Sequence, residues 1–146
     1  MQFLVKKFTS LSLQELYDIL QLRAEVFIVE QNCVYQDIDG KDEKALHILG
    51  INNNKIVAYT RIFKADDYFN TSSIGRVLVK ESERTFNYGH KLIEASIKAI
   101  KNHFKEKKIT ISAQKYLKKF YESHQFKQVE EEYLEDGIPH IKMIKE

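Results

Sequence analysis

The residues with the clearest chemical potential lie between positions 76 and 92, where an apolar run passes through a short polar turn into a helical pattern. A helix that begins soon after a strand presents unpaired backbone N–H groups and the positive end of its dipole, and both attract anions. Asn87 and Gly89 are residue types that tolerate the positive φ angles of an anion-binding turn, and Gly89 also lets a diphosphate approach the backbone. Arg84 would add a charge-assisted contact. The segment therefore predicts a binding site for a phosphate-bearing ligand.

Hydrophobic periodicity indicates the elements that must hold this turn in place. Short alternating or β-branched runs predict strands, and apolar residues at three- and four-residue steps predict amphipathic helices. The expected strands are residues 2–8, 45–51, 55–63, 73–80, 108–113, 126–133 and 138–145. The expected helices are residues 13–28, a segment from about 87 to 104, and 115–124. The anion-binding turn thus joins the fourth strand to the second helix.

The connections between these elements have turn chemistry of their own. Asn52-Asn53-Asn54 and Glu135-Asp136-Gly137 contain residues that tolerate positive φ, so each predicts a hairpin. Residues 30–44 are polar and contain three Asp, which predicts a long ordered loop with room for one helical turn; loops of this length in small domains are often functional. The strand–helix–strand unit from 73 to 113 requires two parallel strands and a right-handed crossover. The sheet is therefore expected to be mixed.

Length and composition place the chain among ordinary globular proteins. With 146 residues, 43% hydrophobic and 30% charged, it has the usual size of one compact domain, and we expect a single domain over residues 1–146. Cys33 is the only cysteine, which excludes an intramolecular disulfide and favours a reducing compartment. The sequence has neither a signal-peptide h-region nor an apolar run of membrane-spanning length. We therefore expect a cytoplasmic protein without a membrane partner.

Charge is unevenly distributed although the net charge is only +2. Between Arg84 and Lys119 there are ten Lys or Arg residues against two acids, Glu94 and Glu106. Such a stretch attracts anions, or it forms the solvated face of a helix. It is also compatible with a basic nucleic-acid-binding module, whose binding would depend steeply on salt. We do not expect a nucleic-acid partner, because phosphates of a small ligand account for the same charges.

The turn at 84–89 resembles the pyrophosphate loop of the GNAT superfamily of acyl-CoA N-acyltransferases, Q/R-x-x-G-x-G/A. Asn87 stands where the first Gly is usual, and Asn is the next most tolerant residue for a left-handed backbone. The resemblance implies acetyl-CoA as the co-substrate and no metal. It also implies that coenzyme is bound by residues of the fourth strand and of the turn: Val77, Leu78, Val79, Arg84, Thr85, Asn87, Tyr88, Gly89 and His90.

Residues 114–126 are similar to the N-x-x-A-x-x-x-Y-x-x-x-G-F segment that follows the fifth strand in this superfamily. Tyr121 falls on the tyrosine, while Gln114 and Gln125 replace the usual Asn and Gly. The resemblance makes Tyr121 the catalytic residue that protonates the departing thiolate and makes Gln114 a cofactor contact. A thiol pKa of about 8.5 and a phenol pKa of about 10 permit a shared proton in a dry site. The residues alone also allow a core aromatic at position 121.

Residues 22–42, 47–50 and 135–140 look like the ElaA-type branch of the superfamily, so the resemblance covers nearly the whole chain. It implies an α/β (α+β) fold with a GNAT-like mixed, mostly antiparallel central sheet of about seven strands. A parallel βαβ crossover and helices on both faces complete this expected architecture. The branch does not define the acceptor.

The expected reaction is transfer of an acetyl group from acetyl-CoA to a primary amine, carried by a small-molecule or peptide acceptor. An ammonium with a pKa of about 10 must first lose a proton, either to a base or by direct attack of the minor neutral amine. The candidate bases by residue type are Glu30, Asp37, Asp39, His47 and His140, and the sequence does not select among them. A sensor that binds acyl-CoA without turnover is the alternative function, and homodimerisation is left open. Neither the Asp-rich loop nor the histidines have metal-site spacing.

Overall fold

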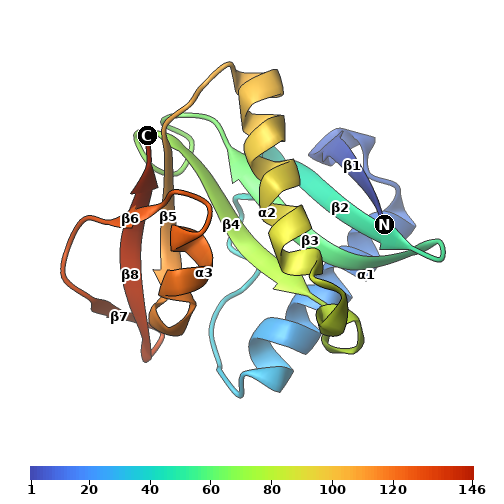
Figure 1. The fold of residues 1–146 in the computed structure, drawn as a ribbon. Helices are drawn as coiled ribbons and strands as arrows, with labels where there is room; N and C mark the ends of the chain where they lie inside the picture. The colour runs from blue at the N-terminus through green and yellow to red at the C-terminus, as the bar shows by residue number, and fades with distance from the viewer.

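Alternating and β-branched runs form one mixed sheet in the computed structural model, which describes all residues 1–146 (Figure 1). The strands follow the order β1-β2-β3-β4-β5-β8-β6, with β7 paired to β8. Only β4 and β5 are parallel, and every other pair is antiparallel. The strands are β1 (Gln2–Lys7), β2 (Leu46–Asn52), β3 (Lys55–Phe63), β4 (Ser72–Val79), β5 (Ile109–Gln114), β6 (Lys127–Gln128), β7 (Tyr133–Glu135) and β8 (Ile138–Lys145).

The predicted mixed, mostly antiparallel sheet with a parallel crossover is confirmed, with eight strands instead of about seven. The extra strand arises because the expected strand 126–133 is divided into β6 and β7 by the exposed glutamates at 130–132. Both predicted hairpins are present. Asn53 and Asn54 have φ angles of 52° and 62°, and Asp136 and Gly137 have φ angles of 52° and 77°, as tight two-residue hairpin turns require.

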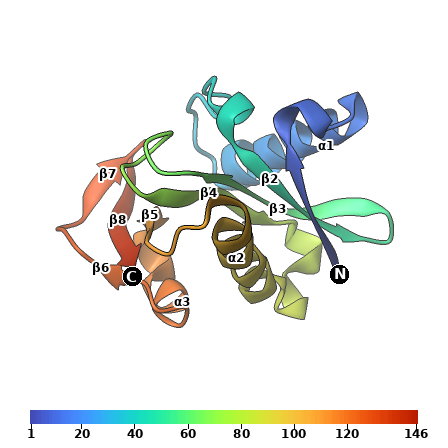
Figure 2. The ribbon, with the colours of Figure 1, turned by 90° about the horizontal axis from the view of Figure 1, so that it is seen from above.

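Helices cover both faces of the sheet, as predicted (Figure 2). Ser12 begins α1 with a capping box, in which its hydroxyl accepts from the Glu15 N–H at 3.0 Å. The helices are α1 (Leu13–Arg23), α2 (Tyr88–Ala99) and α3 (Lys118–Glu122). The expected helices 13–28 and 87–104 are continuous in the structure but change to π-helical winding at residues 24–30 and 100–104. Short 3₁₀ turns occupy residues 8–10, 42–44, 81–86 and 115–117.

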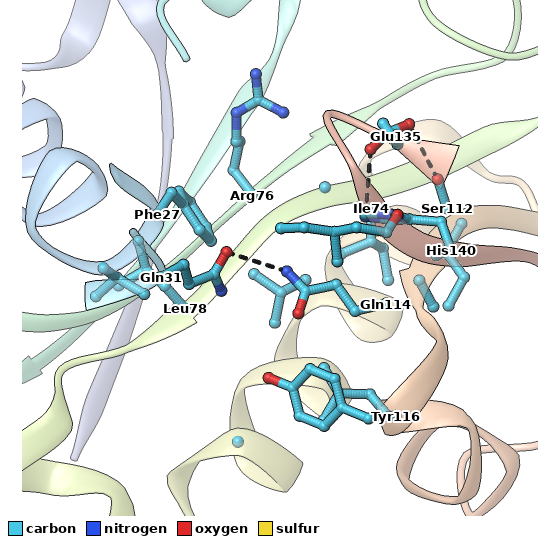
Figure 3. A pocket seen from close by; sticks show the side chains of 18 of the residues that line it. Phe27, Gln31, Ile74, Arg76, Leu78, Ser112, Gln114, Tyr116, Glu135 and His140 are labelled. Atoms are coloured by element: carbon cyan, nitrogen blue, oxygen red, sulfur yellow. Dashed lines mark hydrogen bonds and ion pairs between the residues drawn. The ribbon is translucent and has the colours of Figure 1, made fainter. Parts of the chain in front are cut away.

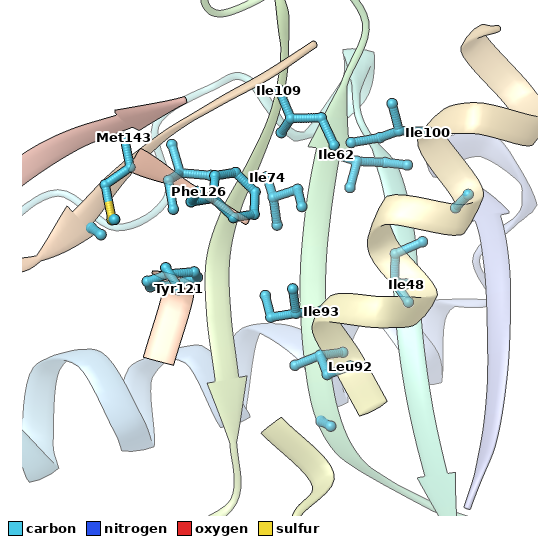
Figure 4. Packing of buried hydrophobic residues seen from close by; sticks show 14 of the residues in the cluster. Ile48, Ile62, Ile74, Leu92, Ile93, Ile100, Ile109, Tyr121, Phe126 and Met143 are labelled. Atoms are coloured by element: carbon cyan, nitrogen blue, oxygen red, sulfur yellow. The ribbon is translucent and has the colours of Figure 1, made fainter. Parts of the chain in front are cut away.

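The sheet separates two apolar layers. The larger layer lies between the sheet and α2 with α3, and it contains Ile62, Ile93, Tyr121 and Phe126 among its buried side chains (Figure 4). The smaller layer lies under α1 and includes residues of α1, the π-helical segment, β3 and β4. Burial of these faces removes the apolar stripes of the helices from water, which is the main driving force for their docking.

Three arginines and three aspartates form a buried charge network beside the second layer. Arg23, at the end of α1, and Arg61, in β3, are 0% and 1% exposed. Arg23 contacts Asp37 at 2.9 Å and Asp42 at 2.8 Å. Arg61 contacts Asp42 at 2.9 Å and Asp39 at 2.5 Å. Because the aspartates all come from the polar loop predicted over residues 30–44, the network fixes that loop onto α1 and β3.

Arg76 of β4 completes the network. Its Nε lies 2.7 Å from Asp37 Oδ1, and one Nη lies 3.4 Å from Asp39 Oδ2. Tyr35 donates its hydroxyl to Asp37 at 2.9 Å. Three positive and three negative charges therefore balance in a site where a lone charge would be costly.

Replacing Arg61 with Met should destabilise the protein strongly, because it leaves Asp39 and Asp42 short of a charged partner. We expect the free energy of unfolding in urea to fall by about 3–5 kcal/mol. Lys80→Met is the matched control, since Lys80 pairs with Glu25 on the surface with 40% and 46% of the side chains exposed, and it should cost less than about 1 kcal/mol. Equal losses in the two variants would contradict a structural role for the network.

His47 is buried next to this network in its neutral form. Its Nε2 donates to the Asp42 carbonyl at 2.9 Å, and its Nδ1 accepts from the Tyr59 hydroxyl at 2.6 Å. Burial lowers the pKa of His47 below its ordinary value of 6.5. The unfolded chain binds a proton at this residue at a higher pH than the folded chain does.

Because of His47, the free energy of unfolding should therefore decrease as the pH is lowered. Its contribution is complete above pH 6.5 and is lost below it, at about 1.4 kcal/mol per pH unit until the lower folded pKa is reached. Urea unfolding at pH 7.5 and 5.0 measures this loss. His47→Gln should show a smaller loss than the parent, whereas exposed His103→Gln should retain it in full. An undiminished loss in His47→Gln would refute the assignment.

Candidate functional site

The sheet opens between its two parallel strands. β4 and β5 pair only at Ser72 with Ile109 and at Ser73 with Thr110, and then diverge toward their carboxyl ends (Figure 1). The two strands therefore splay apart beyond Ser73. Beyond Ser73, the edge of β4 that faces β5 has no strand partner, so its backbone polar groups are available to a ligand.

A β-bulge bends β4 at the opening. Tyr59 lies opposite Leu78 and Arg61 opposite Gly75, so β4 contains one more residue than β3 over this stretch. Arg76 is one of the residues of this bulge and has a φ angle of +50°. This backbone conformation is energetically unfavourable for a residue with a long side chain. Its ion pairs with Asp37 and Asp39 hold the bulge in this conformation.

A pocket of about 810 Å³ fills the opening. Nine of the residues predicted from the sequence line it: Val77, Leu78, Val79, Arg84, Asn87, Gly89, His90, Gln114 and Tyr121. Two do not, because Thr85 is exposed in the 3₁₀ turn and the Tyr88 hydroxyl lies 3.5 Å from Asn52 Nδ2. The structure therefore brings together residues from both segments that were singled out in the sequence.

The strand-to-helix turn has the expected left-handed residue. Asn87 has a φ angle of 61° and directly precedes α2. Gly89 does not have a positive φ angle, so the expectation of a second left-handed position in the turn is wrong. Gly89 instead lies in the first turn of α2 facing Phe120, whose ring would be 3.5 Å from an added Cβ. The N-terminal end of a 12-residue helix thus faces the pocket beneath Asn87.

Arg84 connects the turn to β4 and to the π-helical segment through hydrogen bonds. Its Nε donates to the Val79 carbonyl at 2.9 Å, and its two Nη groups donate to the Glu30 carboxylate at 2.6 Å and 2.9 Å. Hydrogen bonding to Glu30 raises the pKa of Arg84. This bidentate pair joins the end of β4 to the end of the π-helical segment, and it also occupies both oxygens of Glu30.

Tyr121 is held at the wall of the pocket by the end of α3. The Phe126 N–H donates to the Tyr121 carbonyl at 3.2 Å and the Gln125 N–H to the Glu122 carbonyl at 3.0 Å, which is the Schellman arrangement. Gln125 takes the left-handed conformation with a φ angle of 67°, at the position of the Gly in the motif. Tyr121 is 5% exposed, burial raises the pKa of its phenol, and its hydroxyl has no hydrogen-bond partner within the protein.

The opposite wall of the opening is polar (Figure 3). Gln114 Nε2 donates to Gln31 Oε1 at 3.2 Å. The Ser112 hydroxyl donates to Glu135 Oε1 at 3.3 Å, and His140 Nε2 lies 3.4 Å from Glu135 Oε2. The alternation of β5 explains this wall: Ile111 and Ala113 belong to the apolar layer with Tyr121, whereas the residues between and after them point the other way.

Sequence reasoning missed part of this wall. Ser112 could have been found from the alternation of β5, since it follows a buried isoleucine. Gln31 and Glu135 gave no such signal, because they reach the site from a loop and a hairpin that lie far from β5 in the sequence. No group of three or more His, Cys, Asp and Glu side chains is placed to hold a metal ion. None of the helices is both long and apolar enough to cross a membrane.

A mixed sheet that opens between two parallel strands, with a strand-to-helix turn at the opening, is the arrangement seen in the acyl-CoA N-acyltransferase fold. A family model described as "Acetyltransferase (GNAT) domain" matches residues 10–146. Protein ElaA of Escherichia coli (strain K12) is 46% identical over 140 residues, which cover 94% of this chain and 92% of ElaA. The chain therefore belongs to the GNAT acetyltransferase family and to its ElaA-like branch.

Solved structures agree with this assignment. The crystal structure of an acyl-CoA N-acyltransferase from Pseudomonas aeruginosa has a TM-score of 0.94 and 36% identity, with 100% of both chains covered. The crystal structure of Escherichia coli ElaA has a TM-score of 0.92 and 44% identity, with 99% of both chains covered. The fold is that of an acyltransferase.

Proposed function

We propose that this protein, acting as a single domain, transfers an acetyl group from acetyl-CoA to a primary amine. The observation that carries the proposal is the pocket between the diverging ends of β4 and β5, with the Asn87 turn at one side and Tyr121 in its wall. A diphosphate is suited to the N-terminal end of α2, where backbone N–H groups and the helix dipole face the pocket. Membership of the GNAT family and the likeness to an acyl-CoA N-acyltransferase of Pseudomonas aeruginosa support an acyl-CoA donor.

The unpaired edge of β4 suits the acyl-bearing arm of the coenzyme. An extended chain with amide groups can lie between two splayed strands and replace the hydrogen bonds that the strands do not make to each other. Backbone N–H groups near Val79 would then donate to the thioester oxygen, where negative charge develops during acyl transfer. Predicted contacts at Val77, Leu78, Val79, Arg84, Thr85, Asn87, Tyr88, Gly89, His90 and Gln114 remain part of this proposal.

Tyr121 is suited to the second half of the reaction. Because burial raises the pKa of its phenol, the group remains protonated throughout the physiological range and can donate its proton to a leaving thiolate. No protein group competes for this hydroxyl, and its ring is fixed between Phe120 and Phe126, with centroid distances of 5.0 Å and 5.9 Å. The phenol is therefore both positioned and free to donate.

The first test is binding followed by turnover. Saturating acetyl-CoA should raise the melting temperature of the purified protein, because a ligand that binds only the folded state stabilises it. Thiol release should then be followed over a panel of primary amines that includes butylamine, putrescine and glycinamide. A melting temperature that stays constant at saturating acetyl-CoA would contradict the proposal, whereas a shift without thiol release from any amine would favour an acyl-CoA sensor.

Tyr121→Phe should separate binding from chemistry. Loss of a general acid should lower kcat by about 10²-fold or more, while the thermal shift with acetyl-CoA persists. Stability should change little, because the Tyr121 hydroxyl has no partner within the protein. Tyr116→Phe is the matched control, since Tyr116 also lines the pocket but is 76% exposed, and it should keep normal turnover. Unchanged kcat in Tyr121→Phe would remove this residue from the mechanism.

A further inference from the structure

The structure distinguishes among the five candidate bases, beginning with the carboxylates. Both oxygens of Glu30 accept from Arg84. Asp37 and Asp39 belong to the buried arginine network, and hydrogen bonds from Arg61 lower the pKa of Asp39 even though burial acts in the opposite direction. Each of the three carboxylates thus already has an arginine partner within the protein. These three side chains therefore serve structure.

The two histidines differ in the same way. Both ring nitrogens of His47 are engaged, one with Tyr59 and one with the Asp42 backbone, and the side chain does not line the pocket. His140 does line the pocket. Its Nδ1 lies 2.7 Å from the Ile138 carbonyl, and because a carbonyl only accepts, Nδ1 must carry a hydrogen. The neutral ring of His140 therefore has its lone pair on Nε2.

The surroundings of His140 Nε2 favour the binding of a proton there. Nε2 lies 3.4 Å from Glu135 Oε2, and neither a lone pair nor a carboxylate oxygen can donate to the other. The contact becomes favourable when a proton lies on Nε2, or when an ammonium group of a ligand donates hydrogen bonds to both atoms. Tyr133 of β7 stacks on the imidazole at a centroid distance of 6.2 Å, and Gln114 of β5 lies opposite His140 in the sheet. Glu135 is the charged side chain that faces the ring.

The charges of the pocket wall favour a cationic ligand at this place. Arg76 and Arg84 are both paired with carboxylates, and no lysine lines the pocket. The remaining charges are those of Glu135 and Asp136. The chain carries a net charge of +2, but the negative charge on this side of the pocket is not neutralised by a basic side chain. It would therefore attract an ammonium group.

We propose that Glu135 binds the acceptor as an alkylammonium and that His140 Nε2 removes its proton. This inference rests on the proposed acetyl transfer. The ammonium gives one proton to His140, and the neutral amine forms a C–N bond to the thioester carbonyl. The C–S bond then breaks, the thiolate receives a proton from Tyr121, the second nitrogen proton restores the Tyr121 phenol through solvent, and His140 releases the first proton to solvent. One amide, one thiol and one released proton result, so that atoms and charge balance.

His140→Asn tests the base. The asparagine amide can keep the hydrogen bond to the Ile138 carbonyl, but it has no basic nitrogen. With the best amine of the panel, kcat/KM should fall by about 10²-fold or more, and the limb of the pH profile that reports imidazole deprotonation should disappear. The thermal shift with acetyl-CoA should stay as in the parent. His103→Asn, the same substitution at an exposed histidine outside the pocket, should match the parent.

Glu135→Gln tests the ammonium site and the pairing. The glutamine keeps a hydrogen-bond acceptor for Ser112 but loses the charge, so KM for the amine should rise by about tenfold. The value of kcat should change less than KM, and the thermal shift with acetyl-CoA should stay as in the parent, because the substitution removes a binding charge and leaves the base and the coenzyme site in place. The variant lies on an exposed hairpin, where it should fold normally.

Two results would overturn the proposal while leaving acetyl transfer intact. One is a His140→Asn protein that turns over within about threefold of the parent across the pH profile. The other is a Glu135→Gln protein whose KM for the amine stays within about threefold of the parent. Failure of the parent protein itself to bind acetyl-CoA or to release thiol would instead refute the proposed function, so the two failures are distinguishable.

Discussion

The structure depends on the buried balance of three arginines and three aspartates. Arg23, Arg61 and Arg76 come from α1, β3 and β4, whereas Asp37, Asp39 and Asp42 come from one loop. None of these charges could be buried alone, because removal from water costs several kcal/mol per ion. The loop is therefore obliged to lie across the sheet, and the β4 bulge is held with Arg76 in an unfavourable backbone conformation. Pairing of β4 with β5 ends at Ser73, three residues before Arg76, and the pocket occupies the space beyond it.

The sheet also divides the pocket chemically. On the side of α2 and α3 its walls are apolar and include Tyr121, whose phenol is kept protonated by burial. On the other side lie the amide, hydroxyl, carboxylate and imidazole groups of Gln114, Ser112, Glu135 and His140. The diverging strands connect these two environments. A thioester held between the strands would meet a proton donor from one side and an amine from the other.

Local sequence was sufficient for the elements and for the strand-to-helix turn, whereas Tyr121 and the coenzyme contacts of β4 were implied by the resemblance to the GNAT superfamily. Alternation and turn residues predicted the strands, the hairpins and the left-handed Asn87 correctly, because each is decided by neighbours in the chain. The charge network could not be predicted in this way. Asp37 and Asp39 have the composition of a functional loop, and only their distance to Arg61 and Arg76 shows that they stabilise the fold. Arg84 is similar, since its pairing with Glu30 joins segments 54 residues apart.

The same reasoning explains why one base emerges from five candidates of the same residue types. A side chain becomes available for proton transfer when its surroundings leave a nitrogen or oxygen without a partner, and partners are supplied by tertiary packing. Glu30, Asp37, Asp39 and His47 are all satisfied within the protein, whereas His140 Nε2 faces a carboxylate that cannot donate to it. The incomplete pair of His140 with Glu135 on one face and the unpartnered hydroxyl of Tyr121 on the other are thus complementary. His140 can accept a proton and Tyr121 can donate one, as acyl transfer to an amine that arrives as an ammonium requires.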